Sequence, residues 1–421
     1  MTDKSTYRDN VKIVVINTFP LKKMSGATEK HLMDIINVIK DKNEVIFLSV
    51  SKTTTENRFQ GYKQYEIGDG HFVETIVEKS PLWMGVDLGL LMLLGYRPSV
   101  NKANNSSALL KKLLELSPDY IILVGHLFSG LIINYKKAGG KALVVGLEDS
   151  VNQFFSNLEM EGGERSIVTN ATGRLLRRII MDRYIKYNFS QYERLLKVCD
   201  AIVTPIKEHQ QDVRKAFPDM KDKVFVIQAH YFSKLGRFKL KKRVGKLLFM
   251  GGYLYSPNAE AAKLIETVIA PKMKRMKFFI CGKDCPKFTR GNVYYLGTVD
   301  DINKLINEVD VCLSPLFSGV GPRAKVFDYL VNRKAVIGTP RSFKGYAIKD
   351  GYNAIVENDI NNYAKRITEL ERDPSLFEAI QKNSISALKG CSKREVKEKW
   401  DDLFKEIKQR RLNNNDAVPY M

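Results

Sequence analysis

Residues 310–340 restrict the fold of this chain more than any other stretch does. An apolar run at 311–313 is followed by a loop that contains Gly319, Gly321 and Pro322, and then by a helical segment at 323–332. A second apolar run follows at 335–337. Strand, loop, helix and strand in this order form one βαβ unit, whose two strands are parallel. The sequence therefore predicts an α/β fold with a parallel sheet.

The loop of this βαβ unit is predicted to bind an anion. It follows the carboxyl end of a strand and precedes a helix N-terminus, where open parallel sheets bind ligands and where free N–H groups attract negative charge. Arg323 and Lys325 stand in the first helical turn, where cations are normally unfavourable, so we expect them to face a charged ligand. Asp328 shares a helix face with Lys325. This set suits a nucleotide diphosphate and its ribose, whereas the alternative is a glycine turn that serves only packing.

The 421 residues suit two domains of roughly 200 residues each. Buried strands, each followed by a helical pattern, recur on both sides of a polar and basic segment at 230–245, which we interpret as a linker. The predicted organisation is an N-terminal Rossmann-like domain at 1–229, a C-terminal one at 246–391, and a terminal helix with a tail at 392–421. Residues 51–80 are expected to be irregular.

The amino-acid composition limits which binding partners and which cellular compartment are expected. The net charge of +21 favours phosphorylated substrates, anionic membranes or nucleic acid, but no nucleic-acid-binding module is visible. The five cysteines match no zinc pattern, which predicts a reducing, cytoplasmic compartment. We expect no transmembrane helix and no signal peptide, because no apolar run is long enough and residues 1–10 are polar.

Two stretches are candidates for contact with a membrane surface. The apolar stretch 83–97, which begins at Trp83 and ends at Arg97, is either a core helix or a helix that docks on lipid. The stretch 174–197, from Arg174 to Lys197, has apolar residues at helical spacing and many basic residues. It is either a solvated charged face or a docking surface for an anionic membrane.

Polar residues that follow strands of the N-terminal half are further candidates. His126 comes directly after a predicted strand at 120–124, and Glu148 and Asp149 come after one at 141–147. A histidine at a strand end is suitably placed for chemistry, although it can equally serve as a loop cap. The two carboxylates can hold an acceptor hydroxyl, or Asp149 can cap a helix.

Several motifs together resemble one known family. The matching residues are Ser314-Pro315, Gly319-Val320-Gly321, Arg323, Lys325, Asp328-Tyr329-Leu330 and Val336-Ile337-Gly338-Thr339-Pro340. They resemble the nucleotide-sugar site of the retaining glycosyltransferases of family four, of the group 1 type. The resemblance implies the GT-B fold, in which two Rossmann-like domains face each other across a cleft and the final helix crosses back to the N-terminal domain.

The resemblance also implies roles for individual residues. Arg323 and Lys325 would stabilise the leaving diphosphate electrostatically, and His126 would hold the donor sugar. Glu148 and Asp149 would lie on the acceptor side. The implied donor-binding residues are Gly26, Gly252, Gly297, Gly319, Val320, Gly321, Pro322 and Asp328, with Asp328 accepting hydrogen bonds from the ribose.

The chain departs from the family pattern at three places. Val320 occupies the position of the first family glutamate and cannot bind the sugar through its side chain. Ser25 replaces one glycine of the pair that Gly26 would complete. The loop after the first strand of the C-terminal half lacks the arginine found in many relatives, so phosphate charge falls on Arg323 and Lys325. Asn258 in that loop is predicted to be a helix N-cap.

The sequence thus predicts a retaining, metal-independent glycosyltransferase that uses a nucleotide-diphosphate sugar and a glycan or lipid-linked acceptor. No cofactor is expected, and no D-x-D pattern at a strand end calls for a metal. We expect a cytoplasmic protein, peripherally associated with the membrane. Three alternatives stay open: an inactive GT-B nucleotide-sugar-binding protein, a nucleotide-sugar epimerase and a nucleic-acid binder.

Overall fold

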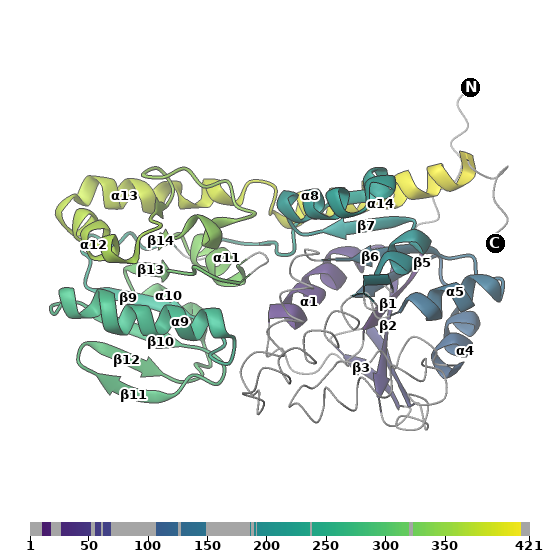
Figure 1. Cartoon of the computed structure of the whole chain (residues 1–421), viewed down its shortest axis with the longest axis horizontal. Coiled ribbons are helices and arrows are strands. Elements are labelled where there is room, and N and C mark those ends of the chain that lie inside the picture. The colour runs from purple at the N-terminus through teal and green to yellow at the C-terminus, as the bar shows by residue number, and fades with distance from the viewer. Residues whose placement is uncertain are drawn as a thin grey trace, which may run out of the picture. The chain divides into compact units, whose positions relative to one another are not determined.

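A computed structural model describes most of the chain and divides it into two compact units. The described residues are 11–17, 27–51, 55–59, 62–68, 107–124, 128–148, 186, 189–190, 192–235, 238–319 and 323–413. Unit 1 comprises Met1–Lys23, Ile36–Ile227 and Lys399–Met421, and unit 2 comprises Met24–Ile35 and Gln228–Glu398. Each unit has its own sheet with helices packed on it (Figure 1).

The sheet of unit 1 has eight strands in the order β3-β4-β2-β1-β5-β6-β7-β8. All neighbours pair in parallel except β3 and β4, which are antiparallel. The strands are β1 (Lys12–Asn17), β2 (Glu44–Ser51), β3 (Thr55–Phe59), β4 (Tyr62–Gly68), β5 (Tyr120–Val124), β6 (Leu143–Leu147), β7 (Ala201–Thr204) and β8 (Val224–Val226).

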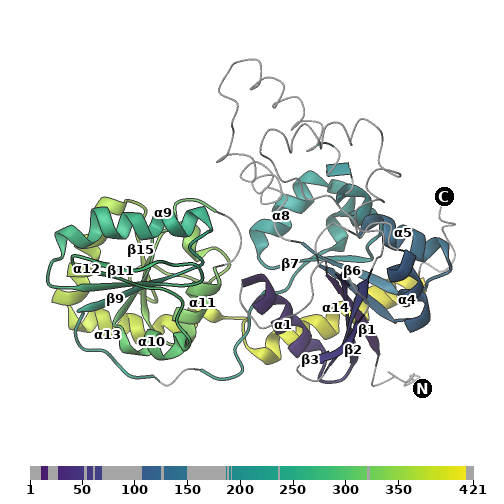
Figure 2. The same cartoon turned by 90° about the horizontal axis from the view of Figure 1, so that it is seen from below.

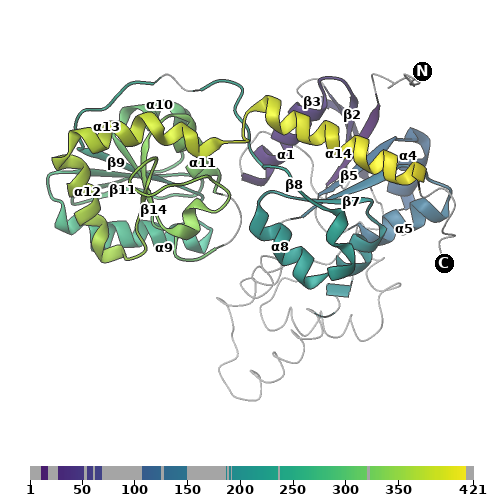
Figure 3. The same cartoon turned by 90° about the horizontal axis from the view of Figure 1, so that it is seen from above.

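Helices cover both faces of this sheet because its central strands are apolar on both sides. One face packs against α4 (Ser107–Leu116), α5 (Ser129–Lys137) and α8 (Lys207–Ala216). The last part of α14 (Lys393–Asn413) lies on the other face (Figure 3). There, Tyr120 of β5 contacts Phe404 of α14, with ring centroids 4.5 Å apart. The Tyr120 hydroxyl also donates to the Phe404 carbonyl at 3.2 Å. The last part of α14 is therefore an integral layer of unit 1.

The expectation of an irregular segment at 51–80 is wrong for part of it. Residues 55–59 and 62–68 form β3 and β4, and β4 pairs with β2 in parallel over six residues from Ile46–Lys63 to Ser51–Gly68. The signal was present, because Tyr62, Tyr65 and Ile67 are residues that favour strands. Polar residues between them hid it, since β3 is the edge strand and β4 is its neighbour, and strands near the edge of a sheet are more polar than central ones.

The sheet of unit 2 has seven strands in the order β11-β12-β10-β9-β13-β14-β15, all parallel except the β11–β12 pair (Figure 2). The strands are β9 (Lys246–Met250), β10 (Lys277–Cys281), β11 (Lys287–Arg290), β12 (Val293–Leu296), β13 (Val311–Ser314), β14 (Ala335–Gly338) and β15 (Ile355–Val356). The helices are α9 (Ser256–Leu264), α10 (Ile302–Glu308), α11 (Ala324–Val331), α12 (Tyr363–Arg372) and α13 (Pro374–Asn383), together with the first part of α1 (Ala27–Ile39).

Alternation along the strands of unit 2 builds a core on each face of the sheet. Leu247 and Phe249 of β9 pack with α9, α12 and α13, whereas Leu248 and Met250 pack with α10 and α11. All four side chains are buried. The sequence pattern thus fixes which helices lie on which face, and so where the loops between them gather.

Strand order places a topological switch point in each unit. In unit 1 the order reverses between β1 and β5, and in unit 2 between β9 and β13. Doubly wound sheets with such a reversal are Rossmann-like, and they bind ligands beyond the carboxyl ends of the two flanking strands. The predicted fold class, with two Rossmann-like domains, is confirmed.

The predicted membrane contacts lie mostly outside the described residues. Residues 83–97 are all outside them, and of 174–197 only 186, 189–190 and 192–197 are described. No helix in the described ranges is long and apolar enough to cross a membrane.

Candidate functional site

The candidate site of unit 2 is formed by the loops that follow β9 and β13, the strands at its switch point. The loop after β13 begins at Pro315 and leads to α11, and the loop after β9 leads to α9. Backbone hydrogen bonds connect the neighbouring loops at the same sheet edge: Gly251 donates to the Cys281 carbonyl at 2.9 Å, and Gly282 donates to the Gly297 carbonyl at 3.0 Å. The chain therefore gathers four strand ends around one place.

Residues of the segment after β14 hold the loop that follows β13. Thr339 is fully buried, and its hydroxyl donates to the Leu316 carbonyl at 2.6 Å. Arg341 donates to the Gly319 carbonyl at 3.1 Å, and the Tyr346 hydroxyl donates to the Arg323 carbonyl at 3.0 Å. These three contacts fix the loop before, within and after its glycine-rich part, which accounts for the Thr339-Pro340 portion of the motif.

Lys325 is a partly buried cation of the site. It is the second residue of α11, and its ammonium nitrogen lies 2.5 Å from Oδ1 of Asn258 and 4.3 Å from the ring centroid of Phe249. Nδ2 of Asn258 donates to the Gly252 carbonyl at 2.9 Å, which turns Oδ1 toward the lysine. Burial lowers the pKa of Lys325 well below its usual value, and the charge of Arg323 lowers it further.

Arg323 is the second cation of the site. It is buried and lies directly before the first residue of α11. Its side chain donates to the Ser318 carbonyl at 3.4 Å and forms a hydrogen bond with the Tyr255 side chain. Burial lowers the pKa of Arg323 as well, while the contact with Tyr255 raises it. Two cations are thus held side by side at a helix N-terminus, where the helix dipole opposes them and favours an anion.

Asn258 does not play its predicted role. Helix α9 begins at Ser256 with Tyr255 as its N-cap, so Asn258 lies inside the helix and not at its cap. Pro257 in the first turn lets the helix begin earlier than expected, because proline is favoured there. The asparagine side chain is instead the hydrogen-bond partner of Lys325, a contact across 67 residues of sequence. Only its presence in the loop beside the predicted phosphate site hinted at this.

Asp328, the predicted ribose ligand, is paired with a lysine in the structure. Its carboxylate lies 2.5 Å from Nζ of Lys30, which belongs to the first part of α1 and thus to unit 2. Lys30 also lies 5.8 Å from the ring centroid of Phe327. Asp328 does share the helix α11 with Lys325, as expected, and its role in ribose binding stays a prediction.

A cluster of two histidines and an aspartate, of which His230 is buried and the other two are partly buried, adjoins this ion pair. Nδ1 of His230 lies 3.1 Å from Oδ2 of Asp34, and the His230 ring is 5.9 Å from His31 and 5.6 Å from Phe327. Burial raises the pKa of Asp34 to about 7 and lowers the pKa of His230 to about 4. Burial also lowers the pKa of His31 to about 3, with a contribution from His230. Sequence analysis missed this cluster because its members come from segments almost 200 residues apart.

The predicted donor-site glycines differ in their surroundings. Gly319 has a φ of +82°, and a Cβ there would lie 2.5 Å from the Tyr255 hydroxyl, so only glycine fits. Gly297 has a φ of +73°, whereas a Cβ on Gly252 would meet nothing within 4 Å. Gly26, Val320, Gly321 and Pro322 lie outside the described residues.

The predicted residues of unit 1 are only partly described. Glu148 follows β6, is 8% exposed, and donates its N–H to the Val203 carbonyl at 2.9 Å. Its neighbour Asp149 and the candidate His126 lie outside the described residues. In the sequence, Gly26 and His126 nevertheless follow β1 and β5, the strands that flank the switch point of unit 1. In the described part of the chain, no group of three His, Cys, Asp or Glu side chains is arranged to hold a metal ion.

Comparison with known proteins agrees with this geometry. Residues 245–373 match the family model of the glycosyl transferases group 1. Among solved structures, the trehalose-6-phosphate synthase OtsA is 11% identical with a TM-score of 0.62, and covers 97% of this chain and 100% of its own. The sucrose-phosphate synthase from Thermosynechococcus elongatus is 9% identical with a TM-score of 0.61, covering 95% and 100%. A mutant of S. aureus TarM is 12% identical with a TM-score of 0.60, covering 94% and 99%.

The chain therefore has the GT-B glycosyltransferase fold, and its enzyme class is that of the glycosyltransferases. Within this class, the segment that matches the glycosyl transferases group 1 model, residues 245–373, carries both Arg323 and Lys325. No curated protein matches the sequence. Residues 245–373 span β9 to α12, so the matched segment contains the switch point of unit 2.

Proposed function

We propose that this protein is a retaining, metal-independent glycosyltransferase that transfers a sugar from a nucleotide-diphosphate sugar to a glycan or lipid-linked acceptor. The observation that carries the proposal is the partly buried Lys325, held by Asn258 and positioned over the ring of Phe249, beside the buried Arg323. Two adjacent cations lose solvation when they are buried, so the site is stabilised by an anion with more than one negative charge. A diphosphate leaving group meets that requirement.

The chemistry of each group follows from its position. When the glycosidic bond to the donor phosphate breaks, negative charge grows on the diphosphate oxygens. Lys325, Arg323 and the N–H groups at the start of α11 stabilise this charge without reorganising, which is an electrostatic contribution to the rate. Cations supplied by the protein take the place that a divalent metal has in other transferases, which supports metal independence.

The retaining outcome is supported by comparison, and the acceptor class is supported by the charge of the chain. The TarM mutant similar to this chain was solved in complex with UDP and alpha-GlcNAc-glycerol. An α-linked sugar bound together with UDP is consistent with retention when the donor is an α-linked UDP-sugar. For the acceptor, the net charge of +21 and the basic stretch 174–197 favour a cytoplasmic protein that meets an anionic, lipid-linked acceptor at a membrane surface.

The first test is turnover with a panel of UDP- and GDP-sugars and lipid-linked acceptors, with and without EDTA. We expect transfer that EDTA does not abolish, and a product whose anomeric configuration, determined by NMR, equals that of the donor. We expect Lys325→Ala to lower kcat by about 10²- to 10³-fold. Lys344→Ala, which removes an exposed lysine of the same unit, is the matched control and should retain activity.

The outcomes separate the alternatives. Donor binding that depends on Lys325 without any transfer would indicate an inactive nucleotide-sugar-binding protein. Conversion of the donor without acceptor would indicate an epimerase. Loss of transfer in EDTA that Mg²⁺ restores would contradict metal independence, and an inverted product would contradict retention.

A further inference from the structure

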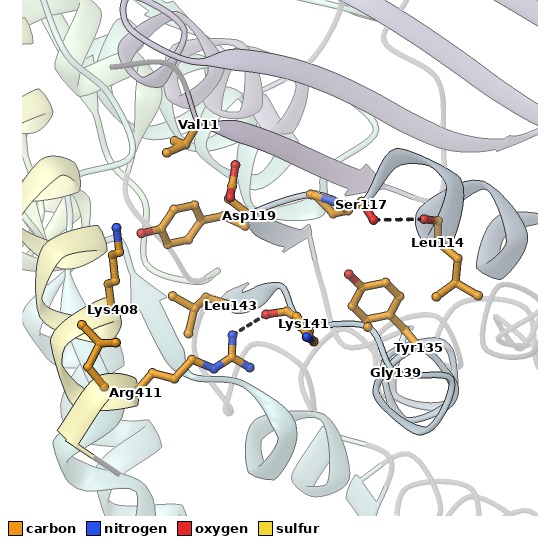
Figure 4. A pocket seen from close by; sticks show the side chains of 14 residues that line it. Val11, Leu114, Ser117, Asp119, Tyr135, Gly139, Lys141, Leu143, Lys408 and Arg411 are labelled. Atoms are coloured by element: carbon orange, nitrogen blue, oxygen red, sulfur yellow. Dashed lines mark hydrogen bonds between the residues drawn. The ribbon is translucent and has the colours of Figure 1, made fainter. Parts of the chain in front are cut away.

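A cavity of about 640 Å³ opens in unit 1 at the amino ends of three neighbouring strands (Figure 4). Val11 precedes β1, Asp119 precedes β5, and Lys141 precedes β6, while the end of α14 forms another wall. Reaction sites of parallel sheets lie beyond the carboxyl ends of the strands. This cavity lies at the amino ends of the strands of the unit 1 sheet, away from the carboxyl ends where a reaction site is expected. Sugar transfer therefore does not explain the cavity.

Apolar side chains form the floor and part of the rim of the cavity. Leu143 and Tyr120 line it and are each only 5% exposed. Leu114 of α4 and Leu412 of α14 also line it, yet they are 36% and 57% exposed. Two large exposed leucines from separate helices therefore meet at one cavity, which offers apolar surface to the body of a ligand.

The charged side chains that line the cavity are mostly basic. Lys141, Lys408 and Arg411 face a single acidic residue, Asp119. The Asp119 carboxylate accepts the Lys12 N–H at 2.8 Å, so its charge is partly balanced by the backbone. Arg411 donates to the Lys141 carbonyl (Figure 4), which uses one of the five N–H donors of its guanidinium. A guanidinium fixed in this way suits a phosphate or a carboxylate.

Two glycines shape the wall of the cavity between α5 and β6. Gly139 has a φ of +86°, and a Cβ on Gly140 would overlap the ring of Tyr135. Tyr135 is 2% exposed, and its hydroxyl accepts the Ala142 N–H at 3.4 Å. The turn at Gly139 and Gly140 can therefore pass closely over the fixed Tyr135 ring, which gives the cavity a well-packed wall on this side. Cavities of roughly 300–1,000 Å³ with such mixed linings are typical small-molecule sites.

We propose that this cavity binds a small soluble organic anion, which carries a phosphate or carboxylate on a ring or short aliphatic body. The body contacts Leu114, Leu143 and Leu412, and the anionic group lies at Arg411 and Lys408. The site is separate from the proposed donor site, so the proposal does not depend on the reaction of the protein.

Calorimetric titration of the full-length protein with phenyl phosphate and benzoate tests the proposal. Benzyl alcohol supplies the ring without the charge, and inorganic phosphate supplies the charge without the ring. We expect at least one aromatic anion to bind, and both reference compounds to bind at least about tenfold more weakly. Absence of binding by both aromatic anions at millimolar concentration would overturn the proposal, as would equal affinity for inorganic phosphate.

Variants of α14 locate the binding. Arg411→Ala and Lys408→Ala each remove a cation and should weaken binding of the aromatic anion, by about tenfold for the arginine. Leu412→Ser should weaken it through the lost apolar contact. Lys405→Ala, which removes an exposed lysine of the same helix outside the cavity, is the matched control and should bind like the wild type. Thermal melts confirm folding, and wild-type affinity in all three cavity variants would show that the anion binds elsewhere.

Discussion

At the scale of single residues, the site depends on one amide that orients one amine. Oδ1 of Asn258 accepts a hydrogen bond from the Lys325 ammonium group. It is oriented for this because Nδ2 of Asn258 donates to the Gly252 carbonyl. The lysine therefore points in a fixed direction before any donor arrives, and preorganised charge is what electrostatic catalysis requires. Asn258 thereby has the character of a positioning residue for the proposed reaction.

Substitution of Asn258 tests this positioning. We expect Asn258→Ala to leave Lys325 buried without its amide partner and to lower kcat/KM by about tenfold. Asn258→Asp should be worse, because a carboxylate at 2.5 Å would neutralise the lysine and repel the diphosphate. Steady-state kinetics of both variants provide the measurement. An aspartate variant as active as the wild type would exclude the positioning role.

Donor binding is expected to take up a proton. Burial and Arg323 lower the pKa of Lys325 in the free protein, whereas a bound diphosphate favours the charged amine and raises that pKa. Protons are thus taken up on binding, and affinity falls as pH rises through the range between the two pKa values. Calorimetric titration of UDP in buffers with different ionisation enthalpies measures the uptake, which Lys325→Met should abolish. Equal uptake in wild type and variant would assign the proton to another group.

The sequence was sufficient to find the cations but not their partners. Arg323 and Lys325 follow from a local pattern, because strand, loop and helix are contiguous. The contacts that define them are not local: Asn258 is 67 residues from Lys325, and Lys30 is 298 residues from Asp328. A sequence pattern reports which residues reach a strand end, whereas which side chains meet there depends on how separate βαβ units pack.

At the scale of elements, the loop after β13 depends on its glycine. Gly319→Ala combines an unfavourable positive φ with overlap of the Tyr255 hydroxyl and close contact with Pro257. We expect the substitution to destabilise unit 2 by about 1–3 kcal/mol. Gly252→Ala is the matched control, since a Cβ there meets nothing within 4 Å. Urea denaturation gives both values, and equal stability of the two variants would show that the loop moves freely.

The stability of unit 2 is expected to depend on pH through the contact between Asp34 in the first part of α1 and His230. The pKa of His230 is about 4 in the folded protein against 6.5 in the unfolded chain. The unfolded state therefore binds the proton more readily, and the contribution of His230 to the free energy of unfolding falls as pH falls from 6.5 to about 4. Asp34 acts in the opposite sense: its folded pKa is about 7 against 3.8 unfolded, so its contribution to stability falls as pH rises from 3.8 to about 7. The two slopes oppose each other between pH 4 and 6.5.

Replacing Asp34 should reveal the pH dependence of stability that is due to His230, because the opposing contribution of Asp34 is then absent. We expect the free energy of unfolding of Asp34→Asn, relative to that of the wild type, to rise with pH between 4 and 6.5, by up to about 1.4 kcal/mol per pH unit. His230→Gln should show the opposite relative slope. Urea denaturation at several pH values measures both differences. Parallel pH profiles for wild type and both variants would mean that neither group is titrating as its burial requires.

At the scale of the whole molecule, the chain divides into two compact units, and the stability of each can be tested separately. Phe404 lies in unit 1 against Tyr120, whereas Gly319 lies in unit 2. We expect calorimetric unfolding to deviate from a single two-state transition. Phe404→Ala should shift only one component, at a cost of about 3–5 kcal/mol, and Gly319→Ala should shift only the other. A single transition displaced by both variants would show that the two units unfold together.

The overall architecture was largely predictable because periodicity marks buried parallel strands strongly. Two series of βαβ units follow from apolar runs such as the buried residues 13–16 of β1 and 247–250 of β9. The edge strands β3 and β11 and the strand β4 beside β3 were missed, because their sequences are polar and have little apolar pattern. The sequence also could not show that the first part of α1 groups with unit 2, since that depends on long-range contacts.

The membership of residues Met24–Ile35 in unit 2 has a consequence for work with fragments of this protein. A fragment that begins at Gln228 contains the complete segment that matches the glycosyl transferases group 1, so it would be the natural choice for excision. It would nevertheless lack Lys30 and Asp34, the partners of Asp328 and His230. The second unit is thus completed by a piece of chain synthesised first, and it reaches its native surroundings only when both ends of the gene are expressed together.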